Sequence, residues 1–151
     1  MDKKSYISKE RFDKEFVIYK NMSEKVLDMV ETNTALFQML DRPPVKEDEK
    51  REFYIKRYEG AASAYNAASK AIYANAPFIP EEIFDLYDDI SKKCLIQLNR
   101  YHIFGPLYST TRQNATDELC NCFENGEEIR NKSDKIISKV REYLTSLDVN
   151  E

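Results

Sequence analysis

Hydrophobic residues recur every three or four positions in four long segments of the chain, which is the spacing of amphipathic helices. The first segment covers about residues 8–40 and stops before Arg42-Pro43-Pro44, because the residue preceding a proline is disfavoured in a helix. The other three cover about residues 45–75, 80–104 and 116–147. Nowhere do β-branched residues alternate over five or more positions, so no strand is predicted.

Four amphipathic helices joined by short connections predict an all-α fold. We expect a single domain over residues 1–151, built as an antiparallel, up-down-up-down four-helix bundle with long helices. A pair of helical hairpins exchanged between two chains would leave the same pattern and stays open as an alternative.

Each predicted helix carries an apolar seam that we expect to face the core. In the second helix tyrosine alternates with alanine between Tyr54 and Ile72, so that neighbouring helices can come close. In the fourth, Gly126 costs about 1 kcal/mol relative to alanine and predicts a kink, a close crossing or a later helix start. The seam of the first helix comprises Phe12, Phe16, Tyr19, Ser23, Val26, Val30, Asn33, Phe37 and Leu40.

Composition narrows the class of protein. The chain has 151 residues and a formal net charge of −4, which disfavours nucleic-acid binding because neutralising phosphates requires excess Lys and Arg. The most apolar stretch, residues 60–76, contains too many polar residues to cross a bilayer, and no secretory signal follows Met1. We therefore expect a cytoplasmic protein without a membrane partner, in which the 3 cysteines are reduced.

Motifs for catalysis, metals and cofactors are missing from the sequence. His102 is the only histidine, whereas a di-iron carboxylate bundle needs two Glu-x-x-His elements. Cys120 and Cys122 are too close in sequence for a typical zinc or thioredoxin-type site, so these residues and Cys94 are expected to pack as small apolar groups. With no phosphate-binding loop or nucleophile motif, we expect neither an enzyme nor a bound cofactor.

The function that this pattern favours is a non-enzymatic protein–protein interaction module, which includes pairing of the chain with itself as a homodimer. Tyrosine is enriched at interfaces, and carboxylates at helical spacing form either a solvated face or a docking surface for a basic partner. The expected partner-binding residues are Glu81, Asp85, Asp88, Asp89, Tyr54 and Tyr58.

The alternative is a sensor that holds a small molecule between its helices. Polar residues on buried seams need hydrogen-bond partners, and a ligand is one possible source of them. The expected ligand-binding residues are Ser23, Asn33, Gln97 and Ser133.

Two segments resemble small helical bacterial proteins to which no activity is assigned. The first runs from Tyr65-Asn66-Ala67-Ala68 into the link Pro77-Phe78-Ile79-Pro80-Glu81-Glu82-Ile83, and the second is the closing helix at residues 136–147. The resemblance implies an all-α fold and a bacterial or phage source. Members of that group often have a long N-terminal helix, sometimes with a membrane anchor, and we expect no such anchor in this sequence.

Overall fold

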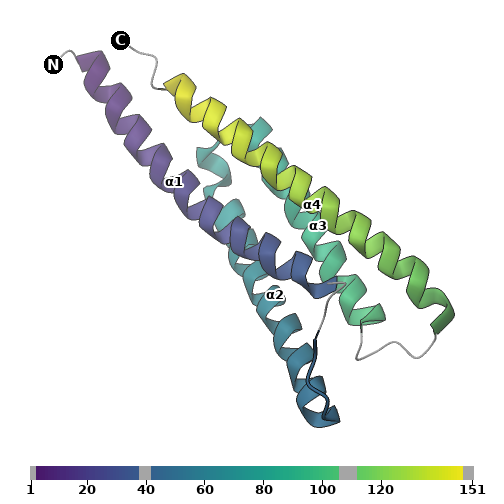
Figure 1. Cartoon of the computed structure of the whole chain (residues 1–151). Helices are drawn as coiled ribbons and strands as arrows, with labels where there is room; N and C mark the ends of the chain where they lie inside the picture. Colours follow the sequence, from purple (N-terminus) through teal and green to yellow (C-terminus); the bar gives the residue numbers. More distant parts are fainter. Residues whose placement is uncertain (1–2, 38–41, 106–111, 148–151) are drawn as a thin grey trace.

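The computed structural model is a bundle of four long helices, α1 (Lys3–Thr34), α2 (Glu47–Asn75), α3 (Glu81–Phe104) and α4 (Arg112–Leu147). It describes residues 3–37, 42–105 and 112–147, with side-chain environments given for 9–37, 42–103, 105 and 121–147. Consecutive helices run in opposite directions, and the start of α1 lies at the same end of the bundle as the end of α4 (Figure 1). The predicted all-α four-helix bundle is confirmed, and the described residues contain no strand.

Helix boundaries follow local chemistry, with some differences from the prediction. α1 gives way at Thr34 to a short 3-10 turn, η1 (Ala35–Phe37), earlier than the predicted residue 40. Its last polar side chains bond back to the helix, since Thr32 Oγ1 donates to the Asp28 carbonyl at 2.8 Å and Thr34 Oγ1 to the Val30 carbonyl at 2.7 Å. Such back-bonding competes with continued helix. Residues 38–41, including the predicted seam residue Leu40, lie outside the described residues.

α2 and α3 begin with acidic residues that suit the positive end of the helix dipole. The first turn of α2 holds Glu47, Asp48 and Glu49, and that of α3 holds Glu81 and Glu82. A second 3-10 turn, η2 (Ala76–Phe78), joins these two helices. α4 begins at Arg112, ahead of the predicted residue 116, so the later start proposed to explain Gly126 is wrong. A Cβ at Gly126 would meet only Gln97 Nε2 at 3.9 Å, an ordinary contact, so a close crossing does not explain this glycine either.

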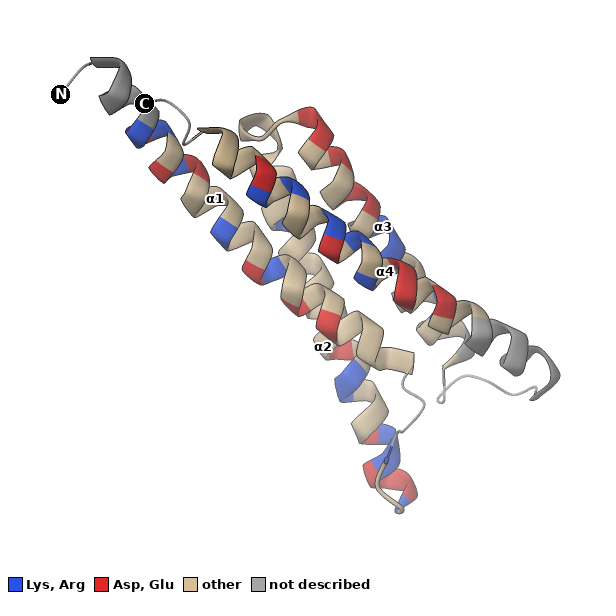
Figure 2. Ribbon diagram, turned by 45° about the horizontal axis from the view of Figure 1, so that its top comes forward, with Lys and Arg blue, Asp and Glu red and all other residues tan. Residues whose placement is uncertain are grey.

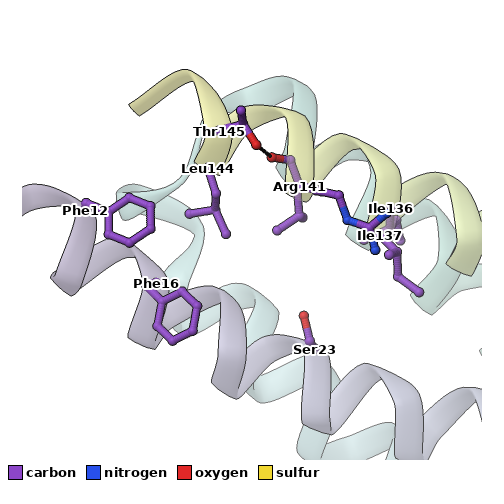
Figure 3. Close-up of a pocket in the computed structure, with 9 residues that line it drawn as sticks. Phe12, Phe16, Ser23, Ile136, Ile137, Arg141, Leu144 and Thr145 are labelled. Carbon is purple, nitrogen blue, oxygen red and sulfur yellow. Dashed lines mark hydrogen bonds between the residues drawn. The ribbon is translucent and has the colours of Figure 1, made fainter. Parts of the chain in front are cut away.

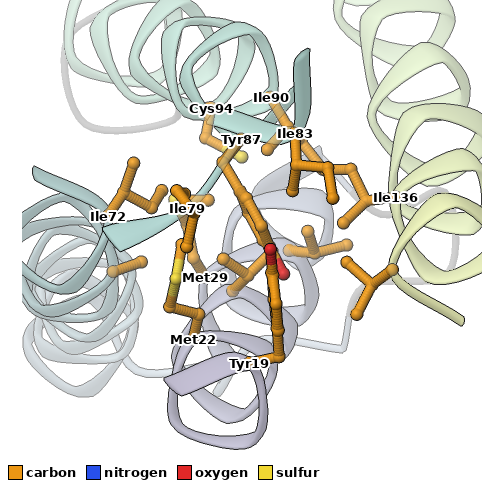
Figure 4. Close-up of a cluster of buried hydrophobic side chains, with 14 of the residues drawn as sticks. Tyr19, Met22, Met29, Ile72, Ile79, Ile83, Tyr87, Ile90, Cys94 and Ile136 are labelled. Atoms are coloured by element: carbon orange, nitrogen blue, oxygen red, sulfur yellow. The ribbon is translucent and has the colours of Figure 1, made fainter. Parts of the chain in front are cut away.

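Each helix packs on its two neighbours, α1 on α2 and α4, and α3 on α2 and α4. The larger buried cluster contains side chains from all four helices, and Figure 4 shows them converging between the helices. Ala61, Ala64 and Ala68 of α2 are buried and form a stripe of alanines along the helix, which confirms this side of α2 as a core face. A smaller cluster at the other end of the bundle contains Leu36, Phe37, Ala61, Leu98, Tyr101 and Cys122.

A buried amide pair joins α3 to α4 at one level of the core. Asn125 Nδ2 donates to Gln97 Oε1 at 2.9 Å, and Gln97 Nε2 donates to the Cys122 carbonyl at 3.1 Å. Asn125 Nδ2 also reaches the Lys93 carbonyl at 3.2 Å. Because buried polar groups are costly when unpaired, this pair favours one register of α3 on α4.

We predict that Asn125→Ala lowers the free energy of unfolding by about 1–3 kcal/mol, because it leaves Gln97 Oε1 buried without a donor. Urea denaturation followed by circular dichroism measures the change. Asn121→Ala is the matched control, since that side chain is exposed on the same helix. Equal effects of the two substitutions would contradict a stabilising role for the amide pair.

Candidate functional site

Carboxylates at the start of α3 were the first candidate, and the structure ties half of them to neighbouring side chains. Asp88 accepts a hydrogen bond from the Tyr73 hydroxyl at 2.7 Å and forms an ion pair with Lys92 at 2.7 Å. Lys92, and then Tyr73, lower the pKa of Asp88. Asp89 pairs with Lys132 of α4. These two carboxylates therefore already have partners within the bundle.

The remaining members of the acidic cluster face solvent. Glu81 and Asp85 are exposed, and Figure 2 shows acidic residues following one another along this part of α3. Within the described part of the chain, no hydrogen bond or ion pair involves either side chain. An exposed pair of this kind has no low-dielectric cleft that would separate two carboxylate pKa values for acid–base catalysis.

The two candidate tyrosines belong to the packed interior more than to the surface. Tyr54 is buried, so its assignment to a partner-binding surface is wrong. Tyr58 is half-buried, and its ring stacks on Tyr101 with centroids 6.1 Å apart and planes 9° apart. Its ring also lies 5.6 Å from that of His102, an exposed residue near the end of α3.

The four candidate ligand-binding residues do not converge on one cavity. Ser23 is exposed, contrary to its predicted place on a buried seam, and Ser133 is half-buried. Asn33 is buried and its Nδ2 donates to the Met29 carbonyl at 2.8 Å and to the Ala61 carbonyl at 3.4 Å. Gln97 is engaged in the amide pair with Asn125. The two amides lie in different places and their nitrogens are bound by protein groups, so this set does not form one shared ligand site. Asn33 Oδ1 is buried without a hydrogen-bond partner.

A groove of about 400 Å³ runs between α1 and α4 and includes the predicted residue Ser23. Figure 3 shows Phe12, Phe16 and Leu144 at one end of it, and Ser23 and Ile137 toward the other. Phe16 is 46% exposed and Ile137 50% exposed, so the groove presents apolar side chains to solvent. Its lining residues are Phe12, Phe16, Ser23, Ile136, Ile137, Val140, Arg141, Leu144 and Thr145.

Tyr19 and Tyr87 belong to the same buried cluster as the groove residues Ile136 and Val140, and Tyr143 packs against this cluster. Tyr143 donates to Glu15 Oε1 at 3.0 Å and packs edge-on against Tyr19 with ring centroids 5.7 Å apart. The hydroxyls of Tyr19 and Tyr87 are buried and make no hydrogen bond of regular geometry. Burial raises the pKa of Tyr87 to about 12, an effect that nearby Ser23 partly offsets, and burial also raises the pKa of Tyr19. Both phenols are neutral donors at neutral pH.

Cysteines offer no reactive centre in the described side chains. Cys94 and Cys122 are both buried, and burial raises the pKa of the Cys94 thiol to about 12. A thiol with so high a pKa is a poor nucleophile and metal ligand at neutral pH. The Cys120 side chain lies outside the described residues. No cluster of three or more potential metal ligands occurs in the part of the chain that the structure describes.

A second groove, of about 690 Å³, lies between α1 and the turn that joins α2 to α3. Its exposed apolar members are Val17, at 65%, and Phe78, at 64%. Glu10, Asp13 and Lys14 surround them with charges of both signs. Phe78 belongs to the link whose resemblance to bacterial helical proteins was noted above.

Sequence reasoning placed Phe12 and Phe16 in the core and did not single out Ile137, so it missed the groove. A usable signal was available. α1 has apolar residues on both sides of its main seam, and α4 carries Ile137 directly after the core residue Ile136. Such widened faces exceed what one neighbouring helix covers.

Comparison with protein-family models, with curated proteins and with solved structures finds no match to this chain. The resemblance to bacterial helical proteins therefore stays a prediction. Among the described residues, no helix combines the length and apolar composition that crossing a bilayer requires.

We predict that the protein loses stability as the pH rises from about 10 to 12, because Tyr87 ionises in the unfolded chain near pH 10 but in the folded protein only near pH 12. The contribution is fully present below about pH 10 and amounts to about 2–3 kcal/mol. Urea denaturation at pH 7 and at pH 11 measures it, and about half of the contribution, about 1.4 kcal/mol, should be lost at pH 11.

Tyr87→Phe should remove part of the alkaline loss while changing stability at pH 7 by less than about 1 kcal/mol, since the hydroxyl has no regular partner. An unchanged difference between pH 7 and pH 11 in this variant would assign the loss to other groups.

Proposed function

We propose that the protein is a non-enzymatic protein–protein interaction module that receives an amphipathic helix of its partner in the groove between α1 and α4. The observation that supports this most is the exposure of large apolar side chains along these two helices. Phe16 and Ile137 line the groove, and Leu27 on α1 is 52% exposed. Exposed apolar grooves of this kind typically mark interaction surfaces.

The dimensions of the groove suit a helix. On α1 it extends from Phe12 to Ser23, which corresponds to about 16 Å or three helical turns. A docked helix buries its apolar stripe against such a length by presenting side chains three or four residues apart. The groove is open along its side, whereas sites for small ligands enclose most of the ligand surface.

The acidic start of α3 supports docking less well than the groove. Asp88 and Asp89 would have to give up existing partners to bind a basic chain, which leaves Glu81 and Asp85 as the available charges. Isolated surface charges contribute little to binding compared with buried apolar contacts.

A second candidate function is the binding of a small amphiphilic molecule in the same groove. One observation favours it specifically: Ser23 and Arg141 make part of the groove polar, while Phe12, Phe16 and Leu144 make its other end apolar. The hydroxyls of Tyr19 and Tyr87, which make no hydrogen bond of regular geometry, lie in the core and are neutral donors.

Neutral phenols and a protonated, buried Cys94 thiol agree with a module that does no chemistry. A cytoplasmic location also belongs to this proposal, and it is supported by the buried, reduced thiol of Cys94.

A photo-crosslinking amino acid placed at Ile137 tests protein docking in the native host. We expect a discrete adduct whose mass corresponds to a protein, because Ile137 lines the groove and half of its surface is open. The matched control carries the crosslinker at Lys70, which is exposed on α2, and should give no such adduct. Phe16→Glu should remove the adduct at Ile137 by placing a charge in the apolar contact.

A small-molecule adduct at Ile137, detected by mass spectrometry of the purified chain, would replace protein docking with the amphiphile function. No adduct at Ile137, or equal adducts at Ile137 and Lys70, would contradict both.

A further inference from the structure

The outer side of α4 carries a second heptad seam. Each of its members comes one residue after a position of the core-facing seam, which includes the buried residues Cys122, Ile129 and Ile136. Successive members are separated by four and three residues in alternation, so they form one stripe along the helix. The members are Phe123, Glu127, Arg130, Asp134, Ile137, Arg141 and Leu144.

The central part of this outer seam is available for contact. Its five central residues are exposed, whereas its end members Phe123 and Leu144 are half-buried and pack against the two buried clusters. In the described part of the chain, no ion pair or hydrogen bond engages the side chains of Glu127, Arg130 or Asp134. The packed neighbours of α4 are α1, α3 and the turn η1, and α1 borders the seam along the groove that Ile137, Arg141 and Leu144 line.

The side chains of the outer seam are complementary to those of a second copy that runs in the opposite direction. Pairing two copies antiparallel about residue 132 brings Arg130 opposite Asp134 of the second copy, and the same pair occurs twice by symmetry. The same register brings Arg141 opposite the ring of Phe123, a cation–π contact, again twice. Glu127 then lies opposite Ile137, where its methylene groups can cover the apolar side chain.

The wider charge distribution of α4 agrees with this orientation. Residues 121–128 contain three acidic residues and no basic ones, whereas residues 130–141 contain five basic residues and one acidic. In Figure 2 the red positions gather near the described start of α4, and blue positions occur farther along it. Antiparallel pairing sets the acidic part of one copy on the basic part of the other, and parallel pairing would set like charges together.

We infer that the occupant of this face is a second copy of the chain, docked antiparallel through the outer seam of α4 as a two-fold symmetric dimer. The inference rests on the proposed function, because Ile137, Arg141 and Leu144 belong both to the seam and to the groove. The α4 helix of the second copy is the amphipathic helix that covers the groove from its α4 side.

Sedimentation velocity over a range of concentrations tests the dimer. The wild-type chain should sediment at twice its mass of 17.8 kDa. In a dimer of the Arg130→Asp variant, the new carboxylate faces Asp134 of the partner copy, and this pair occurs twice. In a dimer of the Asp134→Arg variant, the new cation faces Arg130 of the partner copy, again twice. Each should weaken self-association by roughly tenfold or more, because like charges then face each other across the interface.

Mixing the two variants gives the sharpest result. The Arg130→Asp variant has acidic residues at positions 130 and 134, and the Asp134→Arg variant has basic residues at both. An equimolar mixture should therefore form a heterodimer although each variant pairs only weakly with itself. Lys135→Asp, a charge reversal on the same helix but outside the seam, is the control and should leave the dimer intact. Circular dichroism checks that all variants keep their helix content.

A monomeric wild type, or a mixture that stays monomeric, would overturn the inference. In that case a protein adduct of another mass at Ile137 would leave the proposed function standing, with a different partner. The absence of any protein adduct at Ile137 would contradict the proposed function as well.

Discussion

Close packing of α1 against the alanine stripe of α2 is the constraint on which the rest of the bundle depends. Ala61 and Ala68 are completely buried, and Asn33 of α1 reaches past the short Ala61 side chain to the α2 backbone, 3.4 Å from its carbonyl oxygen. A larger residue at either alanine would push the helices apart, since protein interiors tolerate overpacking poorly. Because α1 leans toward α2, its opposite flank with Phe12 and Phe16 faces the more open side toward α4.

Periodicity was a good guide to the core of α2 and α3. The predicted seam of α2 from Tyr54 to Ile72 is mostly buried, and so are the apolar residues at helical spacing from Ile83 to Tyr101 in α3. It was a poorer guide to α1, where Phe16 and Ser23 share the predicted seam with Tyr19 and yet face the groove. A pattern in one chain defines an apolar face, but the neighbouring helices decide which edge of that face is covered.

At the candidate site, too, the sequence predicted some features and left others undetermined. Sequence spacing placed Asp88 and Asp89 on one face of the third helix, but it carries no information about Tyr73 or Lys132, which come from other helices to pair with them. The polar core residues Asn33 and Gln97 were identified as needing partners. Backbone carbonyls accept from both amide nitrogens and Asn125 donates to the Gln97 amide oxygen, whereas Asn33 Oδ1 has no hydrogen-bond partner. Long-range pairing of this kind depends on the register between helices, which hydrophobic periodicity leaves undetermined.

The hydrogen bond from Tyr143 to Glu15 has a consequence for how the chain folds during its synthesis on the ribosome. It joins positions 128 residues apart, so the chain cannot form it until synthesis is almost finished. During translation, which proceeds at about 5–20 residues per second, α1 can pair with α2 while its flank toward α4 still lacks a neighbour. For several seconds the nascent chain therefore displays Phe12, Phe16 and Tyr19 together, a hydrophobic stretch of the kind that chaperones and neighbouring nascent chains encounter first.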